Sequence, residues 1–504
     1  MIAGPVDESS LSVTVKQDAP KDFASFPDEV LDRVESRPGT KRRASIVSRI
    51  FSNLQSEAQH KSVWITGILF LAENPGIDKL RNEAGSRLLS MARFRSVIKK
   101  SSFTTAVNFM EIDPAEIDMN YHFQTILDDS EKPPSREDVY EYVSGMYDDW
   151  LPDLSKPLWQ ILIVPQTQDG GAAVVTRISH IIGDGVSQVE VLMRLIDAQD
   201  EADAETAKAI RPPEKRKPKK IFGPLKRTSI FLGGVWSGLT AILNKPDPPN
   251  SLCQGSRGVT TLRRKFAFTE KIPLDRIKVL KNKLEDSTIN DVLILMLNET
   301  LRRYFEEAEE TAVLNGGRVT AQFPISTRAR GANAFQDDNP CNSMAYGYLK
   351  FHFEKKGSML DRFWRMKRDI DKIKHSPGPK IQVASIRALS PALPRSILNM
   401  LALGVGDLAT GQLSNIAAPQ KPVHIAGARV DDMTFVLFAP VALYLGLLSY
   451  NGQVNCSVCL DGDLDADPKD VVRHWGDVFA DFEREVLDYD GDMIRRPRFL
   501  TDAL

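Results

Sequence analysis

The amino-acid sequence predicts an α/β (α+β) protein that is organised in two halves. Its 504 residues are too many for a single typical core, which favours two domains. On both sides of a central segment, short apolar runs typical of strands alternate with longer amphipathic stretches typical of helices. Between the halves, residues 201–255 change abruptly in composition. Hydrophobic residues make up 42% of the chain, so most of it should be globular.

The first half begins with a segment that lacks a clear apolar pattern. Residues 1–55 are rich in serine, proline and charge, and we expect a mostly disordered tail. Order should begin near His60, and residues 56–200 form the first domain. The last two strands predicted there flank Asp169-Gly170-Gly171, which is typical of a hairpin. The predicted strands are 63–71, 94–98, 106–110, 161–165 and 172–178, and the predicted helices are 77–91, 136–150 and 185–200.

The boundary segment 201–255 has two interpretations. Residues 211–227 hold eight basic residues against one acid, and the uncharged apolar stretch 229–243 follows. That stretch is too short to span a bilayer core of about 30 Å comfortably. A basic run beside an apolar helix that contains tryptophan suits an anionic membrane surface. The segment is therefore either an exposed linker with a short buried helix or, over 211–243, a membrane-surface anchor.

The second domain is assigned to residues 256–504. Ser287-Thr288 followed by Asp291 is typical of a helix start, and the apolar run behind it continues as a long helix. The predicted strands are 261–268, 319–324, 342–353, 435–438, 444–450 and 453–460, and the predicted helices are 274–284, 292–305, 363–375, 386–400 and 471–487.

The segment around His180 carries the clearest chemical signal. A buried strand leads into His180, and the chain then turns through Gly183-Asp184-Gly185 into an apolar helix. A histidine held at a strand end can face a cleft and act as a general base, because imidazole titrates near neutral pH. The same pattern also fits a packed histidine followed by a turn and a helix N-cap. The predicted apolar face of the helix comprises Val186, Val189, Leu192, Met193 and Ile196.

Together with four other segments, this one resembles a known family. His180-x-x-x-Asp184-Gly185 is similar to the His-x-x-x-Asp-Gly signature of chloramphenicol-acetyltransferase-like, CoA-dependent acyltransferases. The full set resembles the wax ester synthase/diacylglycerol acyltransferases, in that family's order, from about residue 60 to 490. The resemblance implies two chloramphenicol-acetyltransferase-like domains with mixed sheets that flank a central cleft or tunnel. The other four segments are Pro157-Leu158-Trp159, Thr288-Ile289-Asn290-Asp291-Val292, Leu413-Ser414-Asn415-Ile416-Ala417-Ala418-Pro419 and Leu448-Ser449-Tyr450-Asn451-Gly452.

The resemblance implies that His180 is the base that takes the proton of an acceptor hydroxyl. Asp184 and Asn290 are expected beside it, with Asp184 orienting the turn through an arginine such as Arg328. Gly185 would permit close backbone approach or unusual dihedral angles. The candidate donors to an oxyanion or substrate are Asn290, Asn415 and Ser414. Capping and turn formation are the alternative roles for the two asparagines.

Two departures from the family pattern stand out. The family usually has two adjacent histidines, and Ser179 occupies the place of the first, whereas Ala418 stands where glycine is usual. Pro157 and Trp159 should pack under the strand that leads to His180, with a place along the acyl channel as the alternative. His122, expected in a family-like strand, should have a surface or packing role.

The nucleophile and the redox state also follow from the sequence. The pattern Gly-x-Ser-x-Gly is absent, so direct attack by the bound alcohol is favoured over a covalent acyl-enzyme. Four cysteines make no disulfide framework and indicate a reducing compartment. Cys456 and Cys459 lack a second pair for a zinc site, and their spacing in a strand points them to opposite faces. We interpret both as packing residues and expect no metal.

The leading hypothesis is an acyl-CoA:alcohol O-acyltransferase. It would move a long-chain acyl group to a fatty alcohol and/or diacylglycerol, giving wax esters and/or triacylglycerol. Acyl-CoA would be a co-substrate, with no permanently bound cofactor. Two alternatives stay open: another acyl-CoA-dependent or condensation-type acyltransferase of the same fold, and a non-catalytic lipid-binding relative.

The expected location is the cytoplasmic face of a membrane, with a membrane or lipid-droplet surface as partner through residues 211–243. In a eukaryote the membrane would be the endoplasmic reticulum or a lipid droplet. A formal net charge of −2 gives no global drive toward nucleic acid. Residues 1–20 contain no continuous apolar core, so secretion is not expected. The sequence leaves the oligomeric state open.

Overall fold

A computed structural model describes most of the chain. The described residues are 25–32, 34–57, 63–101, 106–147, 153–197, 247–253, 263–328, 335–336, 339–353, 357–376, 378–379, 409–439 and 441–497. The predicted helix 386–400 and the segment 211–243 lie outside them. Among the described helices, none is both long enough and apolar enough to cross a membrane.

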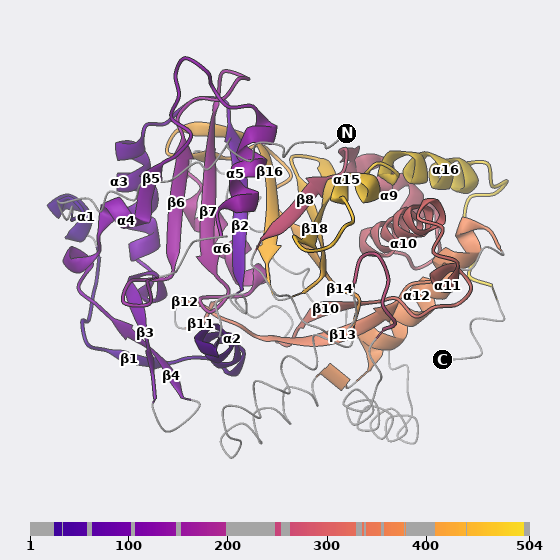
Figure 1. Cartoon of the computed structure of the whole chain (residues 1–504), viewed down its shortest axis with the longest axis horizontal. Coiled ribbons are helices and arrows are strands. Elements are labelled where there is room, and N and C mark those ends of the chain that lie inside the picture. Colours follow the sequence, from indigo (N-terminus) through magenta and orange to yellow (C-terminus); the bar gives the residue numbers. More distant parts are fainter. Residues whose placement is uncertain are drawn as a thin grey trace, which may run out of the picture.

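Two mixed sheets form the centres of the two halves, which confirms the predicted fold class (Figure 1). The first has the order β15-β16-β2-β7-β6-β5, in which only β5 and β6 pair in parallel. The second has the order β13-β10-β14-β17-β18-β8, with β9 also paired to β18 and parallel pairs on both sides of β14. The strands of the first sheet are β2 (Trp64–Leu71), β5 (Phe123–Thr125), β6 (Trp159–Val164), β7 (Ala172–Ser179), β15 (His424–Ile425) and β16 (Ala428–Phe438). Those of the second are β8 (Arg264–Phe268), β9 (Ile272–Pro273), β10 (Thr320–Ser326), β13 (Met344–Lys350), β14 (Gly411–Ala417), β17 (Leu443–Tyr450) and β18 (Gln453–Asp461).

Helices and two small sheets complete the fold. The first small sheet has the order β1-β4-β3, and the second pairs β11 with β12. Their strands are β1 (Lys41–Arg43), β3 (Ser96–Lys100), β4 (Val107–Glu111), β11 (Phe335–Gln336) and β12 (Asn339–Pro340). The helices of the first half are α1 (Asp28–Leu31), α2 (Ile46–Glu57), α3 (Ile77–Leu89), α4 (Met119–His122), α5 (Arg136–Gly145) and α6 (Gly185–Leu195). Those of the second half are α9 (Leu274–Lys283), α10 (Ile289–Glu307), α11 (Thr311–Leu314), α12 (Met359–His375), α15 (Pro468–Val472) and α16 (Trp475–Leu487).

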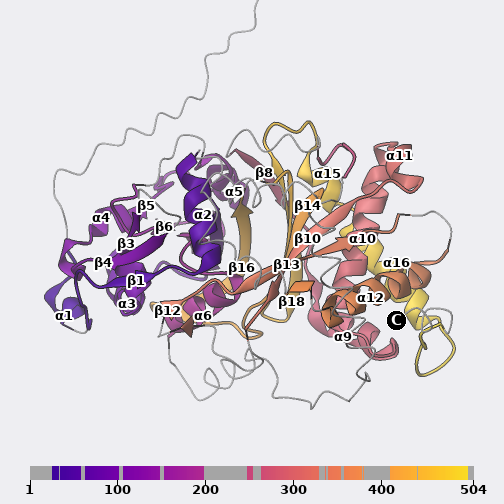
Figure 2. The same cartoon turned by 90° about the horizontal axis from the view of Figure 1, so that it is seen from below.

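The second sheet lies between a layer of helices and the first half (Figure 2). Successive side chains of a strand point to opposite faces. In β17, Leu445 and Leu447 pack into a core shared with α9, α10, α12 and α16, whereas Tyr444 and Leu448 belong to the core of the first half. Cys456 and Cys459 of β18 separate in the same way, one in each core, as their spacing predicted.

One strand of the second half belongs to the first sheet. β16 pairs antiparallel with β2, with Thr434 opposite Ile68 and Phe438 opposite Trp64. β2 in turn pairs with β7, the strand that leads to His180. The edge of the first sheet is therefore built by the second half, a connection that the sequence pattern did not indicate.

The structure corrects the expected N-terminal tail. Residues 25–57 contain α1, β1 and α2, and β1 pairs with β4. The apolar side chains of α2 recur with the helical period, and Ile46 and Phe51 are buried. The prediction of disorder up to residue 55 is therefore wrong for the described part of this segment. Part of the serine and charge that suggested disorder lies inside the fold, because Ser48, Arg49 and Ser52 of α2 are buried, whereas Lys41 and Arg43 of β1 are exposed.

Several predicted elements differ in their limits. α6 buries Ser187, Val191 and Leu195; of the predicted apolar face, Leu192, Met193 and Ile196 pack against the core of the first half, whereas Val186 is 51% exposed. His122 ends the short helix α4 instead of lying in a strand, because Asp118 caps that turn. The helix predicted over 471–487 is two helices, α15 and α16, and the helix predicted over 136–150 ends as α5 at Gly145. Phe94 and Arg95, the first residues of the strand predicted over 94–98, belong instead to a 3₁₀ turn over residues 92–95 that precedes β3.

Candidate active site

His180 follows directly on β7 and is fixed by its neighbours. Its backbone N–H donates to the carbonyl of Val63 at 2.9 Å, which extends the β2–β7 ladder by one bond. The residue is only 8% exposed. The ring of Phe51, on α2, meets the imidazole edge-on with 4.8 Å between ring centroids. The segment that was expected to be a disordered tail therefore packs on the predicted base.

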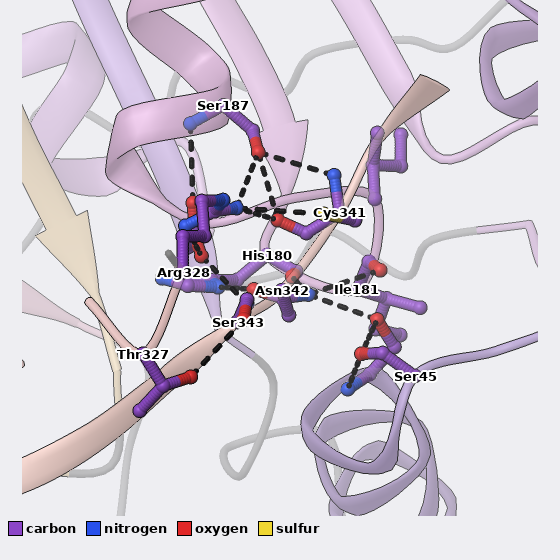
Figure 3. A network of polar contacts seen from close by, with 12 residues as sticks. Ser45, His180, Ile181, Ser187, Thr327, Arg328, Cys341, Asn342 and Ser343 are labelled. Carbon is purple, nitrogen blue, oxygen red and sulfur yellow. Dashed lines mark hydrogen bonds and ion pairs between the residues drawn. The ribbon is translucent and has the colours of Figure 1, made fainter. Parts of the chain in front are cut away.

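Asn342, which the sequence analysis missed, holds the imidazole (Figure 3). Its Nδ2 donates to the carbonyl oxygens of His180 and Ile181, at 2.7 and 3.3 Å, and to Ser48 Oγ at 2.9 Å. Its Oδ1 lies 3.2 Å from Nδ1 of His180. A carbonyl oxygen can only accept, so the amide nitrogen must face the two carbonyls and Oδ1 must face the ring. Nδ1 then carries the hydrogen, and Nε2 keeps its lone pair free to act as a base.

Burial lowers the pKa of His180 below its ordinary value. Three smaller effects raise the pKa: the charge of Asp184, a hydrogen bond to the residue's own carbonyl, and the bond to Asn342. The neutral imidazole is thus favoured because the charged form would lose hydration in this site.

Asp184 organises the turn after His180. Its Oδ1 accepts from the N–H of Ser187 at 3.1 Å and so caps α6. Arg328 donates to both oxygens, at 2.9 and 3.0 Å, in a bidentate pair whose side chains are 9% and 5% exposed. The N–H of Ser343 also donates to Asp184, at 2.8 Å. Arg328 is therefore the arginine partner that the sequence analysis expected for this aspartate.

Arg328 also connects the turn to the chain segment that carries Asn342. It donates to the carbonyl of Cys341 at 2.7 Å and to Ser187 Oγ at 3.0 Å. Burial alone would lower the pKa of Arg328, but the hydrogen bonds and charge of Asp184 raise it overall. Because Cys341 precedes Asn342, the ion pair and the imidazole contact belong to one rigid network (Figure 3).

The tight glycine of the motif is Gly183 and not Gly185. A β-carbon on Gly183 would lie 2.9 Å from Cβ of Pro340 and 3.0 Å from Cβ of Ser187, so the close approach of β12 requires glycine there. A β-carbon on Gly185 would meet only the side chain of Ile416, at 3.6 Å, an ordinary contact. The role expected for Gly185 thus falls to Gly183, and Gly185 is the first residue of α6.

The Asp184→Asn variant should lose much of the stability of the fold. Asparagine keeps the capping oxygen, so the loss reports the ion pair with Arg328 together with the hydrogen bond from the N–H of Ser343. Removing one partner of a buried pair costs about 3–5 kcal/mol. The free energy of unfolding, from urea denaturation, measures the effect.

The exposed pair of Arg429 and Asp431 offers a matched control, and Asp431→Asn should leave the unfolding midpoint unchanged. Equal midpoints for the two variants would contradict this account.

The structure does not bring Asn290 and Asn415 to His180. Nδ2 of Asn415, in β14, donates to Oδ1 of Asn290 at 2.9 Å, at the first turn of α10. The alternation along β14 gives Leu413 and Asn415 to the helix face, whereas Ile416 packs against the core of the first half. Ser414 shares the face of Ile416, and its side chain bonds to Tyr444. Of the three predicted donors, only Ser414 faces the half that carries His180.

The remaining predicted residues build the support under β7. Trp159 pairs across from Ile178, and its Nε1 donates to the carbonyl of Phe94 at 2.7 Å. His122 stacks on Trp159 with 4.2 Å between ring centroids, and burial lowers its pKa to about 3. Pro157 is buried, and its carbonyl accepts from the N–H of Trp159 at 3.0 Å. The burial of Trp159, His122 and Pro157 agrees with the packing role that was expected for them.

Ser179 is buried and has a local role. Its Oγ accepts from the N–H of Ile181 at 3.3 Å, and its carbonyl accepts from the N–H of Ile182 at 3.0 Å. Both bonds close the turn that carries His180. A serine hydroxyl commonly forms such a turn with the backbone two residues ahead. In this chain the serine thus stabilises the turn of the base.

The signals that could have revealed the missed residues are weak. Asn342 lies in the polar run Asp337-Asp338-Asn339-Pro340-Cys341-Asn342-Ser343 before β13, a composition that is typical of any turn. Ser48 and Phe51 lie in a helical apolar pattern, with Ile46, Ile50 and Leu54, inside a segment dominated by charge. Only the fold brings these positions to His180.

The fold and this network define a class, the two-domain acyltransferases with a histidine at the end of a central strand. Two family models match the chain: the wax ester synthase/diacylglycerol acyltransferase catalytic domain over residues 54–293 and the WS/DGAT C-terminal domain over residues 341–483. The chain therefore belongs to the wax ester synthase/diacylglycerol acyltransferase family, and it is an acyltransferase.

Individual relatives agree with this assignment. A probable diacylglycerol O-acyltransferase of Mycobacterium tuberculosis is 24% identical over 469 residues, which cover 85% of this chain and 93% of that protein. Wax ester synthase/diacylglycerol acyltransferase 2 of Arabidopsis thaliana is 23% identical, with 63% of this chain and 70% of that protein covered. The solved structure of the wax ester synthase/diacylglycerol acyltransferase from Marinobacter aquaeolei VT8 shares the fold, with a TM-score of 0.57, 18% identity and coverage of 88% of this chain and 100% of that one.

Proposed function

We propose that His180 is the general base of acyl transfer from acyl-CoA to a fatty alcohol or diacylglycerol. The observation that carries the proposal is the orientation of the imidazole, whose Nδ1 is held by Asn342 and whose Nε2 is left as the basic atom. Nε2 takes the hydroxyl proton while the alcohol oxygen attacks the thioester carbonyl. The tetrahedral intermediate then expels the CoA thiolate, which takes the proton from the imidazolium. Ser414 is the proposed donor to the oxyanion.

The lipids that the enzyme produces identify its acyl acceptor as a fatty alcohol or diacylglycerol. The chain should be expressed in a host that lacks neutral lipid, with and without fed fatty alcohol, and the extracted lipids separated. Wax ester that appears only with fed alcohol indicates a wax ester synthase, and triacylglycerol without it indicates a diacylglycerol acyltransferase. Absence of both, with soluble protein present, would contradict the proposal. Activity only with carrier-protein thioesters would instead favour a condensation-type enzyme.

The pH dependence of kcat/KM should report the pKa of His180 in the free enzyme. Burial lowers its pKa from an ordinary value near 6.5, so the neutral imidazole predominates at pH 6.5. As the pH falls through the lowered pKa, the ring takes a proton and can no longer act as a base. We therefore expect the acid limb of the kcat/KM profile below pH 6.5, measured with purified enzyme and acyl-CoA. An acid limb above pH 7 would contradict this expectation.

We also propose that residues 211–243 hold the enzyme on an anionic membrane or lipid-droplet surface, on the cytoplasmic side. The eight basic residues of 211–227 and the apolar stretch with Trp236 support this. Binding should be measured by flotation with vesicles of phosphatidylcholine, with and without phosphatidylserine. Replacing the eight basic residues by glutamine should abolish binding to the anionic vesicles. Equal flotation of the unchanged protein and the glutamine variant with the anionic vesicles would contradict the proposal.

A further inference from the structure

A short basic motif precedes α2. Arg42 and Arg43 lie three and two residues before Ser45, and the apolar Ile46 follows it. Serine/threonine kinases that select basic substrates recognise such a charge pattern. β1 is an edge strand of its sheet, Arg43 is exposed and Ser45 is half-buried. An edge strand can leave its single neighbour more easily than a central strand, which gives a kinase access to the motif.

Ser45 is linked to the imidazole of His180 by consecutive hydrogen bonds (Figure 3). Its Oγ accepts from the N–H of Ser48 at 3.1 Å, so it caps the start of α2, and its hydroxyl donates to Ser48 Oγ at 3.0 Å. Ser48 is completely buried, and its Oγ accepts from Nδ2 of Asn342. Asn342 orients His180 through Oδ1. A change at Ser45 therefore reaches His180 through two side chains.

Three arginines lie within four residues of Ser45: Arg42 pairs with Glu111 at 3.6 Å, whereas Arg43 and Arg49 form no ion pair among the described residues. Arg49 begins the second turn of α2 and is 8% exposed, and within the described residues its Nε has no hydrogen-bond partner. Burial and the charge of Arg43 both lower the pKa of Arg49. The start of a helix of this length also favours negative charge. These features together suit a phosphoryl group on Ser45.

We propose that Ser45 is a phosphorylation site for a basic-directed serine/threonine kinase, and that its phosphorylation slows acyl transfer. Ser45 Oγ attacks the γ-phosphorus of a nucleoside triphosphate, the bond from that phosphorus to the β,γ-bridging oxygen breaks, and the nucleoside diphosphate leaves. The hydroxyl proton passes to the base of the kinase. The site itself does not depend on the role of His180, whereas the effect on acyl transfer rests on the function proposed above.

The phosphorylated side chain can no longer donate to Ser48. A phosphoryl group is also too large for the 3.0 Å between the two oxygens, so the side chain must turn toward solvent or α2 must shift. Ser48 then loses the partner that fixes its hydroxyl, and Asn342 loses a fixed acceptor. The imidazole becomes less well oriented, which lowers kcat, whereas the binding of acyl-CoA is unaffected.

The test uses the full chain, ATP and the catalytic subunit of cAMP-dependent protein kinase as the probe. Peptide mapping should place one phosphate on Ser45. The phosphorylated enzyme should lose about threefold to tenfold in kcat, a part of the full general-base contribution, with an unchanged KM for acyl-CoA. Arg43→Ala should prevent phosphorylation, whereas Lys41→Ala, one position outside the motif, should not. In Ser45→Ala the kinase should have no effect on kcat.

Each opposite outcome overturns a named part of the proposal. No phosphate on Ser45 of the folded enzyme would refute the site. Full phosphorylation of Ser45 with unchanged kcat would refute the link to His180. If His180→Ala keeps full activity while phosphorylation of Ser45 still lowers kcat, the proposed base is wrong and the modification acts by another route. The two failures are thus distinguishable.

Discussion

Replacing His180 by alanine should lower kcat for ester formation by about 10²–10⁴-fold, the usual contribution of a general base. The variant should still bind acyl-CoA, because proton abstraction is a separate step from binding. Ester formation is measured with labelled acyl-CoA and fatty alcohol, and binding by calorimetry with a non-hydrolysable acyl-CoA analogue. His375→Ala is the matched control, since His375 is exposed at the end of α12 and should be dispensable. Substantial ester formation by His180→Ala would refute the assignment.

Replacing Asn342 by alanine should have the second-largest effect on activity. The variant removes the acceptor that keeps the hydrogen on Nδ1, and Nδ1–H and Nε2–H tautomers then compete. We expect kcat to fall by roughly 10²-fold, at the low end of a general-base contribution, with KM for acyl-CoA nearly unchanged. The carbonyls of His180 and Ile181 and the hydroxyl of Ser48 also lose a donor, at about 1–3 kcal/mol for a buried unpaired group.

A control variant at a neighbouring residue, Asn339, separates the effect of Asn342→Ala on stability from its effect on catalysis. Asn339 lies on the same segment, and its Oδ1 accepts from the N–H of Arg93 at 2.9 Å. Asn339→Ala should therefore lose stability, in thermal melting, but keep kcat. If both variants lose the same fraction of kcat, the effect is on folding, and Asn342 has no separate role in orienting the base.

Local patterns predicted the parts of the site that lie next to each other in the sequence. The strand before His180, the cap at Asp184 and the helix after it follow from residues within one short segment. The Thr288–Asp291 capping box at the start of α10 is equally local and is present, with Asp291 accepting from the N–H of Thr288 at 2.9 Å. Such features depend on backbone chemistry within a few residues, which composition and spacing record directly.

Contacts between distant segments could not be predicted in this way. Asn342 lies 162 positions from His180, and Ser48 lies 294 positions from Asn342. Only the packing of both halves brings them together, and their residue types would serve equally well in any polar turn. Asn290 and Asn415 show the converse. Their family-like motifs are local, and their side chains bond to each other, with no hydrogen bond to His180 among the described residues.

β16 belongs to the second half but pairs with β2 in the first sheet, and this pairing restricts how the enzyme can open to its substrates. Eight paired positions tie β16 to β2, so the halves cannot swing apart as hinged rigid bodies without breaking a ladder in the sheet that carries His180. The acyl donor and the acyl acceptor must then enter through movements of loops and side chains, while the two sheets keep their relative position. The same ladder forbids division of the molecule at the central linker. A fragment that ends at residue 200 would present β2 as a bare apolar edge and should aggregate.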